Sequence, residues 1–405
     1  MGTPVRARII AGTRLQGRRT KCPKNTKASI KIAALNIRGM GNTNSWHPEN
    51  KWNHINQIMR TKRIGIMIIG ETHLNDERRD AVEGMPRSRL RIIHSEDPES
   101  PNARGVAIVL NKELTTTESI RAVEIIPGRA LLLETCWHGT EKLSILGVYA
   151  PASSPPQNAQ FWTDIRKFFE DNPDIRRPDV MAGDMNITED SIDRIPAKPD
   201  NASAVDSLDE MRTELQLIDG WRTCYPTTLK YTWRRPATGS QSRIDRIYVK
   251  NNIYEHCYEW GIEKAGVPTD HDMVTVRFST ATAPKIGHGR WVMPLHVVKD
   301  SHVKGFILRA GHELQESIEK CVQSEHRTSD ENPQKLWEVF TEKLCELARQ
   351  RAKATVPNID KEIHQLEVEI TAAENSANLG DESSKTNLMI LHERLDKITQ
   401  LCHRK

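Results

Sequence analysis

The stretch "IGIMIIGET", residues 64–72, places an almost unbroken apolar run directly before an acid. Strands that are covered on both faces read as continuous apolar runs, whereas half-exposed strands alternate apolar and polar residues. This segment therefore predicts a strand in the middle of a layered core. Glu71 would lie just beyond the end of that strand.

Further segments with β-type character recur along the chain, and helical patterns lie between them. They are residues 30–37, 105–111, 130–137, 143–150, 179–186, 243–249 and 275–278. Apolar residues at helical spacing surround Trp52, Trp162 and Leu208. Mixed strands and helices over about 250 residues predict one layered α/β domain with a sizeable core.

The sequence changes character after Ala283, where a short linker precedes a highly charged helical region. Apolar stripes begin near Leu336, Ile359 and Leu388, and the last two could pair as an antiparallel helical hairpin. The predicted divisions are a basic arm over 1–29, the α/β domain over 30–280, a linker over 281–300 and a helical extension over 301–405.

Positive charge is concentrated at the start of the chain. The net charge is only +4, yet residues 1–48 contain ten Lys and Arg and no Asp or Glu. Such an arm suits a nucleic-acid backbone, because each phosphate contact releases counterions. A solubilising tail or an organelle presequence would have the same composition, so the arm leaves these three interpretations open.

Cysteine usage and hydropathy exclude several classes of protein. The seven cysteines are scattered and include no Cys-x-x-Cys pair, which argues against a disulfide framework and a structural zinc site. A reducing compartment, nuclear or cytoplasmic, is the expectation. No run approaches the ~18 apolar residues of a membrane span, so no membrane partner is expected.

Polar side chains follow several of the predicted strands, at positions that chemistry could use. Each has an ordinary explanation as a cap, a turn acid or a surface ion pair. Together they form the set that metal-assisted phosphoryl transfer requires. These residues are Asn36, Glu71, Tyr149, Asp184, Asn186, Asp245, Asp270 and His271.

The residue types suggest a division of roles. Glu71 and Asp270 can supply the oxygen ligands that Mg²⁺ prefers. An ionised Asp184 can act as the base for an attacking water. Asp245 could orient His271 and keep it protonated. The protonated imidazole, with Asn186, Asn36 and the Tyr149 hydroxyl, could stabilise charge on phosphate oxygens.

Two other kinds of hydrolytic or nucleotide site are not indicated. The chain has no Gly-x-Ser-x-Gly elbow for a serine hydrolase and no Gly-x-x-x-x-Gly-Lys-Ser/Thr loop for a nucleoside triphosphate.

Six short motifs occur in one order: "LNIRG" (35–39), "GETH" (70–73), "VYAP" (148–151), "GDMN" (183–186), "SRIDRIYV" (242–249) and "TDHDMV" (269–274). They resemble the motif series of the endonuclease/exonuclease/phosphatase superfamily over residues 30 to 280. "YTWRRP" (231–236) ahead of "SRIDRI" is similar to the apurinic-type endonuclease domain of non-LTR (LINE-like) retrotransposons.

The resemblance implies a fold and a reaction. The fold is a four-layer α/β sandwich, two packed β-sheets flanked by helices, here with a C-terminal helical extension. The reaction is cleavage of one strand of double-stranded DNA that leaves a 3′-hydroxyl, with Mg²⁺ as cofactor, for which Mn²⁺ could substitute. The helical extension would match the segment that leads to a reverse transcriptase. That polymerase and the RNA of the parent element are therefore expected partners.

The resemblance also implies residue roles. Asn36, Glu71 and Asp270 would lie at the metal, and Tyr149 would contact the phosphate. Asp184 and Asn186 would handle the nucleophile and the scissile group, while Asp245 would orient His271. Arg38 stands where repair-type relatives tend to carry an acid. It is a candidate for DNA contact, together with Arg234 and Arg243. Asp272 matches no motif position and is expected to be an ordinary turn acid.

Two alternatives remain at this point. The same chemistry would serve a phosphatase or phosphodiesterase that acts on lipids or inositol phosphates. A retroelement-derived chain could also have lost catalysis and act only by binding DNA. The chain contains no Asp-Asp pair, so no polymerase signature is present.

Overall fold

The computed structural model describes residues 8–10, 29–44, 47, 49–100, 103–118, 120–138, 141–235, 238–279, 293, 295–323, 332–354, 358–375 and 381–403. The chain divides into two compact units. One comprises residues 1–284 with 366–405, and the other comprises residues 285–365. Most of the expected basic arm and of the expected linker lies outside the described residues.

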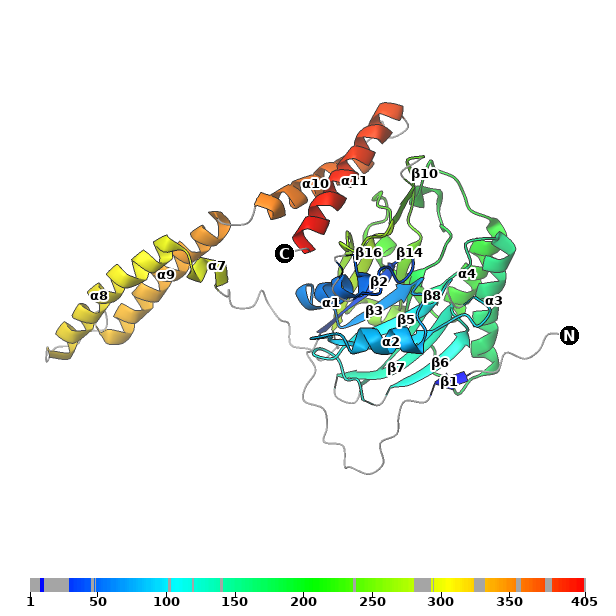
Figure 1. Ribbon diagram of the computed structural model, residues 1–405, viewed down its shortest axis with the longest axis horizontal. Helices are drawn as coiled ribbons and strands as arrows, with labels where there is room; N and C mark the ends of the chain where they lie inside the picture. The colour runs from blue at the N-terminus through cyan, green and yellow to red at the C-terminus, as the bar shows by residue number, and fades with distance from the viewer. Residues whose placement is uncertain are drawn as a thin grey trace, which may run out of the picture. The chain divides into compact units, whose positions relative to one another are not determined.

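Two mixed β-sheets form the centre of the first unit (Figure 1). Across the first sheet the strands are β15 (Cys257–Glu263), β16 (Met273–Ser279), β2 (Ser29–Asn36), β3 (Ile66–Gly70), β5 (Val106–Asn111) and β4 (Leu90–Ser95). Across the second they are β1 (Arg8–Ile10), β6 (Arg121–Ile126), β7 (Ala130–His138), β8 (Glu141–Tyr149), β9 (Val180–Asp184), β14 (Asp245–Lys250) and β11 (Leu217–Asp219).

A third, small sheet has three short strands. They are β10 (Arg194–Ile195), β13 (Ser240–Ser242) and β12 (Trp233–Arg235), in that order across the sheet. The short helices of the unit are the 3₁₀ turn η1 (Ser191–Asp193), α5 (Gly220–Cys224) and α6 (Asn251–Tyr254).

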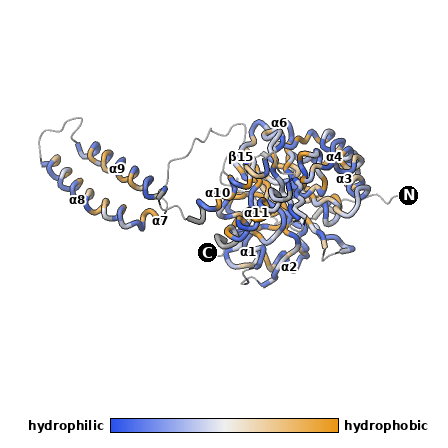
Figure 2. The backbone as a smooth tube through the Cα atoms, turned by 90° about the horizontal axis from the view of Figure 1, so that it is seen from above, coloured by the Kyte–Doolittle hydropathy of each residue, from blue (hydrophilic) through white to orange (hydrophobic). Residues whose placement is uncertain are grey.

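Helices cover the outer faces of the two large sheets. One buried cluster, which includes Ile68, Ile145 and Ile247, holds the inner faces of the sheets together. On the outer face of the second sheet, Trp162 packs with residues of α3 (Pro155–Asp171) and α4 (Ala202–Glu214). On the outer face of the first, Trp52 and other residues of α1 (Lys51–Thr61) pack with Val82 of α2 (Asp76–Glu83). The predicted four-layer α/β sandwich is therefore confirmed, and apolar residues gather inside it (Figure 2).

Strand register brings the polar strand ends together. In the parallel pair β8–β9, Tyr149 lies opposite Asp184, which in turn lies opposite Asp245 in the antiparallel pair β9–β14. Gly183 is required there, because its φ is +144° and a Cβ would lie 1.9 Å from the Val148 carbonyl oxygen.

The eight strands expected from apolar runs are all present, but three longer strands were not predicted. These are β4, β6 and β15. Each mixes charged residues into a short run; β6, for example, reads "RAVEII". Their signal is weak, because their stability depends on pairing with neighbouring strands rather than on an apolar run of their own.

Helices make up most of the described residues after Ser279. The second unit contains α7 (Leu295–Val298), α8 (Ser301–Gln323) and α9 (Pro333–Ala354). The rings of Phe306 and Phe340 stack between α8 and α9 at 6.0 Å, and both helices mix apolar and polar residues (Figure 2). After these come α10 (Asn358–Glu374) and α11 (Glu382–His403). From Leu366 onward the chain belongs to the first unit, so the expected extension is divided between the two units.

Among the helices that the structure describes, none combines the length and the apolar character of a membrane crossing.

Candidate active site

The eight expected catalytic and metal residues gather at one end of the two large sheets. Asn36 is the central connection among them. Its side-chain amide donates hydrogen bonds to Glu71 Oε1 and to Asp184 Oδ2, each at 2.9 Å, and its oxygen accepts the Arg38 backbone N–H. Asn36 therefore joins the end of the first sheet to the end of the second. It orients Glu71 and Asp184, and its amide oxygen keeps a second lone pair, so the expected place of Asn36 at the metal stays a prediction.

Tyr149 adds a hydroxyl to the same group. Its O–H donates to Glu71 Oε1 at 3.0 Å. Burial, and then the charge of Glu71, raise the pKa of the phenol, so it stays protonated. The Arg129 guanidinium lies over the ring, 5.3 Å from its centroid, and donates to the Tyr149 carbonyl oxygen. The phenol is thus held as a fixed hydrogen-bond donor.

Asp184 is buried and close to a second carboxylate. Burial, and then the charge of Asp245, raise the pKa of Asp184 to about 7. Its Oδ1 accepts the Asn186 backbone N–H at 2.9 Å. The Asn186 side chain donates to the Ala150 carbonyl oxygen at 2.8 Å. A carboxyl group that titrates near neutral pH is suited to take a proton from water.

Asp245 and His271 form a buried pair. The Asp245 Oδ2 and the His271 Nδ1 are 2.8 Å apart. Burial alone would lower the pKa of His271, but the charge and hydrogen bond of Asp245 raise it to about 10. The imidazole is therefore cationic at neutral pH and can stabilise negative charge. One ligand atom each of Asp184, Asp245 and His271 lie within 4.8 Å of one another.

Glu71 and Asp270 are the residues that fit a hard cation. The Asp270 Oδ2 accepts the Trp233 indole N–H at 3.1 Å, while its Oδ1 is buried without a hydrogen-bond partner. Carboxylate oxygens of this kind suit Mg²⁺. The Asp184, Asp245 and His271 group fits less well, because a protonated imidazole has no lone pair for a metal.

Comparisons with known proteins identify the family of this chain. The Endonuclease/Exonuclease/phosphatase family matches residues 33–271, more than half of the chain. This chain belongs to that family.

A relative and two solved structures extend the comparison. The "Transposon TX1 uncharacterized 149 kDa protein" of Xenopus laevis is 34% identical over 175 residues, which are 42% of this chain and 13% of that protein. The AP endonuclease LMAP from Leishmania major has a TM-score of 0.52 at 15% identity and covers 62% of this chain and 88% of its own. An AP endonuclease from Archaeoglobus fulgidus has a TM-score of 0.50 at 16% identity and covers 62% and 100%. The two structures show the fold of this family member.

Two of the three arginines expected at DNA are in buried ion pairs. Arg243 is 2% exposed and donates to Asp193 and Asp219 at 2.7–2.8 Å. Arg234 forks onto Asp272 at 3.0 and 2.5 Å. Neither guanidinium can reach a phosphate without breaking these pairs, so both are withdrawn as DNA contacts.

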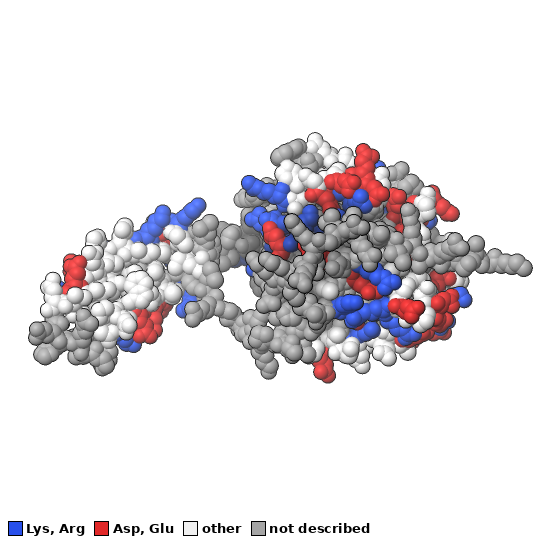
Figure 3. Space-filling model, turned by 90° about the horizontal axis from the view of Figure 1, so that it is seen from below, with Lys and Arg blue, Asp and Glu red and all other residues white. Residues whose placement is uncertain are grey.

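Arg38 keeps its place as a candidate contact. Its side chain is 70% exposed and lies 3.7 Å from Asp270, at the edge of the site. On the face of the molecule in Figure 3, Lys and Arg lie among Asp and Glu. The position of Arg38 next to Asp270, rather than the charge of the surface, therefore makes it the arginine to test.

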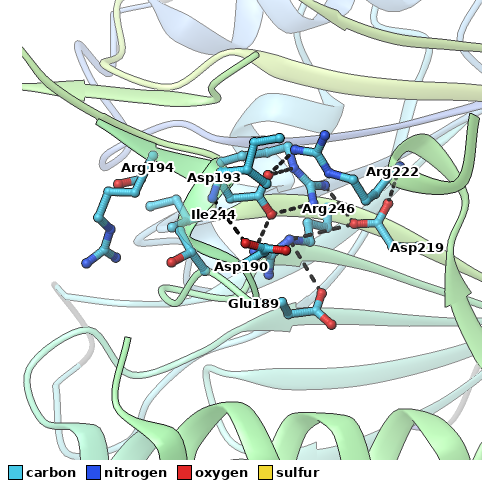
Figure 4. A network of polar contacts seen from close by, with 12 residues as sticks. Glu189, Asp190, Asp193, Arg194, Asp219, Arg222, Ile244 and Arg246 are labelled. Atoms are coloured by element: carbon cyan, nitrogen blue, oxygen red, sulfur yellow. Dashed lines mark hydrogen bonds and ion pairs between the residues drawn. The ribbon is translucent and has the colours of Figure 1, made fainter. Parts of the chain in front are cut away.

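Arg243 belongs to a buried charge network with Asp193 and Asp219, which Figure 4 labels. Arg222 and Arg246 also surround Asp193, and Arg246 lies near Asp219 and Glu189. The network fixes the start of β14, which carries Asp245. Alternating charge in "SRIDRIYV" was the only sequence sign of it.

Several residues that hold the site match no catalytic position of the sequence motifs. Asp272, expected to be an ordinary turn acid, is buried between Arg234 and Lys264, whose Nζ is 3.1 Å away. The Thr232 hydroxyl accepts the backbone N–H groups of Ile244 and Asp245. These residues belong to, or contact, the "YTWRRP" segment, which the family resemblance had marked without giving a physical reason.

Proposed function

We propose that this family member is a metal-dependent DNA endonuclease that hydrolyses one strand and leaves a 3′-hydroxyl. One observation carries the proposal. A carboxyl group with a pKa near 7, Asp184, lies beside the cationic His271; Asn36 links it to Glu71, and Asp270 directly precedes His271. A base, a cation and a hard-metal site in one place are what phosphodiester hydrolysis requires.

The nucleophile in this proposal is a water molecule. Asp184 takes its proton as the oxygen bonds to phosphorus, and Asn186 helps to hold the scissile phosphate. The bond from phosphorus to the 3′-oxygen breaks, and that oxygen takes up a proton from solvent. The products are a 3′-hydroxyl and a 5′-phosphate.

Positive charge and hydrogen-bond donors stabilise the transition state. His271 faces the extra negative charge on the phosphate oxygens, and the Tyr149 hydroxyl would turn its single proton from Glu71 to the same oxygens. Glu71 and Asp270 would hold Mg²⁺, or Mn²⁺ in its place, which supplies charge neutralisation at the phosphate. Asn36 would fix the orientation of Glu71.

We also propose that the natural substrate is the target site of a non-LTR retrotransposon. The similarity to the TX1 transposon protein and the ordered motifs support this assignment. The 3′-hydroxyl would then prime synthesis by the element's reverse transcriptase on its RNA. Such a reaction on chromosomal DNA would take place in the nucleus.

A plasmid nicking assay tests the enzyme. The purified protein is incubated with supercoiled plasmid in Mg²⁺ and in EDTA, with Asp184→Ala and Asp174→Ala alongside; Asp174 is exposed and belongs to none of the motifs. We expect open circles only with Mg²⁺, with wild type and with Asp174→Ala. Polymerase extension of the nick without prior phosphatase treatment checks the 3′-hydroxyl.

The other outcomes distinguish the alternatives. Folded wild-type protein that binds plasmid but never nicks it, over a broad pH range, would indicate a DNA-binding relic. Hydrolysis of inositol phosphates without DNA cleavage would indicate a phosphatase.

A further inference from the structure

We propose that α11, with the end of α10 from Leu366 to Glu374, is a working part of the catalytic unit, and that His392 on α11 positions the loop that carries His271. The loop is residues 269–272. The inference rests on the proposed function for its kinetic consequence, but the structural coupling can be measured without it.

Arg234 on β12 connects α11 to the catalytic loop. Its Nε–H donates to His392 Nε2 at 3.1 Å. Its two terminal nitrogens donate to the two carboxylate oxygens of Asp272, the residue directly after His271. One planar guanidinium therefore contacts α11 and the catalytic loop at once, and its orientation depends on both His392 and Asp272.

Lys264 forms a second connection between the same two parts. Its Nζ lies 3.1 Å from Asp272 Oδ1 and 2.9 Å from Asp396 Oδ1 on α11. On α10, Glu374 is fully buried, with Lys230 at 3.9 Å and His392 Nε2 at 3.3 Å. Asn375 also hydrogen-bonds the Leu229 backbone.

His392 is the neutral member of this cluster. Three cations (Arg234, Lys264, Lys230) and three carboxyl groups (Asp272, Asp396, Glu374) surround it. The residue is 6% exposed. Burial, and then the charges of Arg234 and Lys264, lower its pKa, so the imidazole is neutral. The hydrogen bond from the Arg234 Nε–H assigns the lone pair to Nε2.

β12 and the residue before it also contact the catalytic loop, through the backbone and through the Trp233 side chain. Trp233 forms a backbone bridge with His271, and its indole N–H donates to Asp270 Oδ2 at 3.1 Å. The Arg234 backbone N–H donates to the Asp270 carbonyl oxygen, and the Asp272 N–H donates to the Thr232 carbonyl oxygen at 2.6 Å. A shift of Arg234 would therefore move the hydrogen-bond partners of Asp270, beside His271.

The polar contact of His392 predicts a different effect from that of the apolar residues that pack the same helix. Apolar residues of α11, such as Leu388 and Leu395, are buried and contribute to its stability. Loss of such packing changes the free energy of unfolding. Loss of the His392 acceptor should instead release the Arg234 guanidinium and change the Trp233–Asp270 hydrogen bond in a protein that stays folded.

The experiment uses the full chain with ¹⁵N-labelled tryptophan and the His392→Leu variant. The Trp233 indole signal is identified by its absence in Trp233→Phe. We expect it to shift in His392→Leu, kcat for nicking to fall about 10-fold, as for other residues that orient a site, and KM to stay within about 2-fold. His392→Gln should restore both, because its amide oxygen can accept from Arg234.

The control is His364→Leu, which changes an exposed histidine on α10. It should leave the Trp233 signal and the nicking rate at wild-type values. If His392→Leu does not fold, Asp396→Asn asks the same question through Lys264, and a smaller shift of the same signal is expected.

Each result decides the matter. An unmoved Trp233 signal in folded His392→Leu, or in Asp396→Asn where the first variant does not fold, overturns the proposal, even if nicking falls. Equal shifts in His392→Leu and His364→Leu also overturn it, because the effect would then not pass through Arg234. A shift confined to the His392 and Asp396 variants, in protein that never nicks DNA, keeps the coupling and rejects the endonuclease function.

Discussion

Two buried groups of charges lie on neighbouring parts of the second sheet, and the same residue type behaves oppositely in them. In the arginine network, burial alone would raise the pKa of Asp193, but Arg243, with Arg246 and Arg222, lowers it to about 2. In the catalytic group, burial and the charge of Asp245 raise the pKa of Asp184 to about 7. Depth of burial is similar, so the partners decide whether an aspartate is inert or reactive.

The largest expected effect is a loss of stability when the arginine network is broken. Arg243→Met leaves Asp193 and Asp219 buried with fewer cations. Removing one partner of a buried ion pair costs about 3–5 kcal/mol, so we expect a loss of that size in the free energy of unfolding. Urea denaturation measures it. A loss no larger than that of an exposed arginine, such as Arg177→Met, would contradict the assigned role of the network.

Substitutions in the catalytic group should lower kcat rather than stability. We expect Asp184→Ala and His271→Ala each to lower kcat by ~10² or more, the usual scale for an acid–base or electrostatic group. Neither should unfold the protein, which circular dichroism checks. Wild-type cleavage by either folded variant would remove that residue from the mechanism.

The two pKa values predict a bell-shaped pH profile. Asp184 must be ionised to accept a proton, so kcat/KM should rise with pH up to about 7. His271 must be protonated, so activity should fall as pH rises through about 10. Asp245→Asn removes the charge that raises the His271 pKa, and its upper limb should move to lower pH. An upper limb that stays in place would mean that another group produces it.

The smallest expected effect is a change in stability that should have opposite signs at Asp184 and Asp193. The raised pKa of Asp184 means that its charged form disfavours folding, so its cost is absent at low pH and grows as pH rises through about 7. Asp184→Asn should therefore stabilise the protein by ~1 kcal/mol at pH 9, less than the full linkage value because hydrogen bonds change. Asp193→Asn should destabilise it. Thermal unfolding of both variants at pH 9 measures the two changes in stability. Changes of the same sign would contradict the proposed difference between Asp184 and Asp193.

Local pattern carried the prediction of the fold and of the catalytic residues. Apolar runs such as residues 64–69 show burial on both faces directly, and a polar residue at a strand end needs no long-range information to be noticed. The family resemblance grouped these ends into one site. The hydrogen bond from Asn36 to Asp184 and the register of Tyr149 against Asp184 now give the physical basis for that group.

Burial of charged residues was not predictable in the same way. Arg38, Arg234 and Arg243 all lie in short polar segments of the sequence. Arg38 is exposed, whereas Arg234 and Arg243 form ion pairs with buried aspartates. Whether an arginine meets solvent or an aspartate depends on residues 24 to 50 positions away, such as Asp219 and Asp193.

Residue patterns along the chain were enough to predict the layered α/β class, the strands with apolar cores and the candidate catalytic side chains, because each of these features is visible among neighbouring residues. The pKa of Asp184, the burial of Asp272 and the contact of α11 with the catalytic loop could be learned from the three-dimensional structure alone. Electrostatic energies depend on distances in space, and the contact from Arg234 to His392 spans 158 residues of sequence.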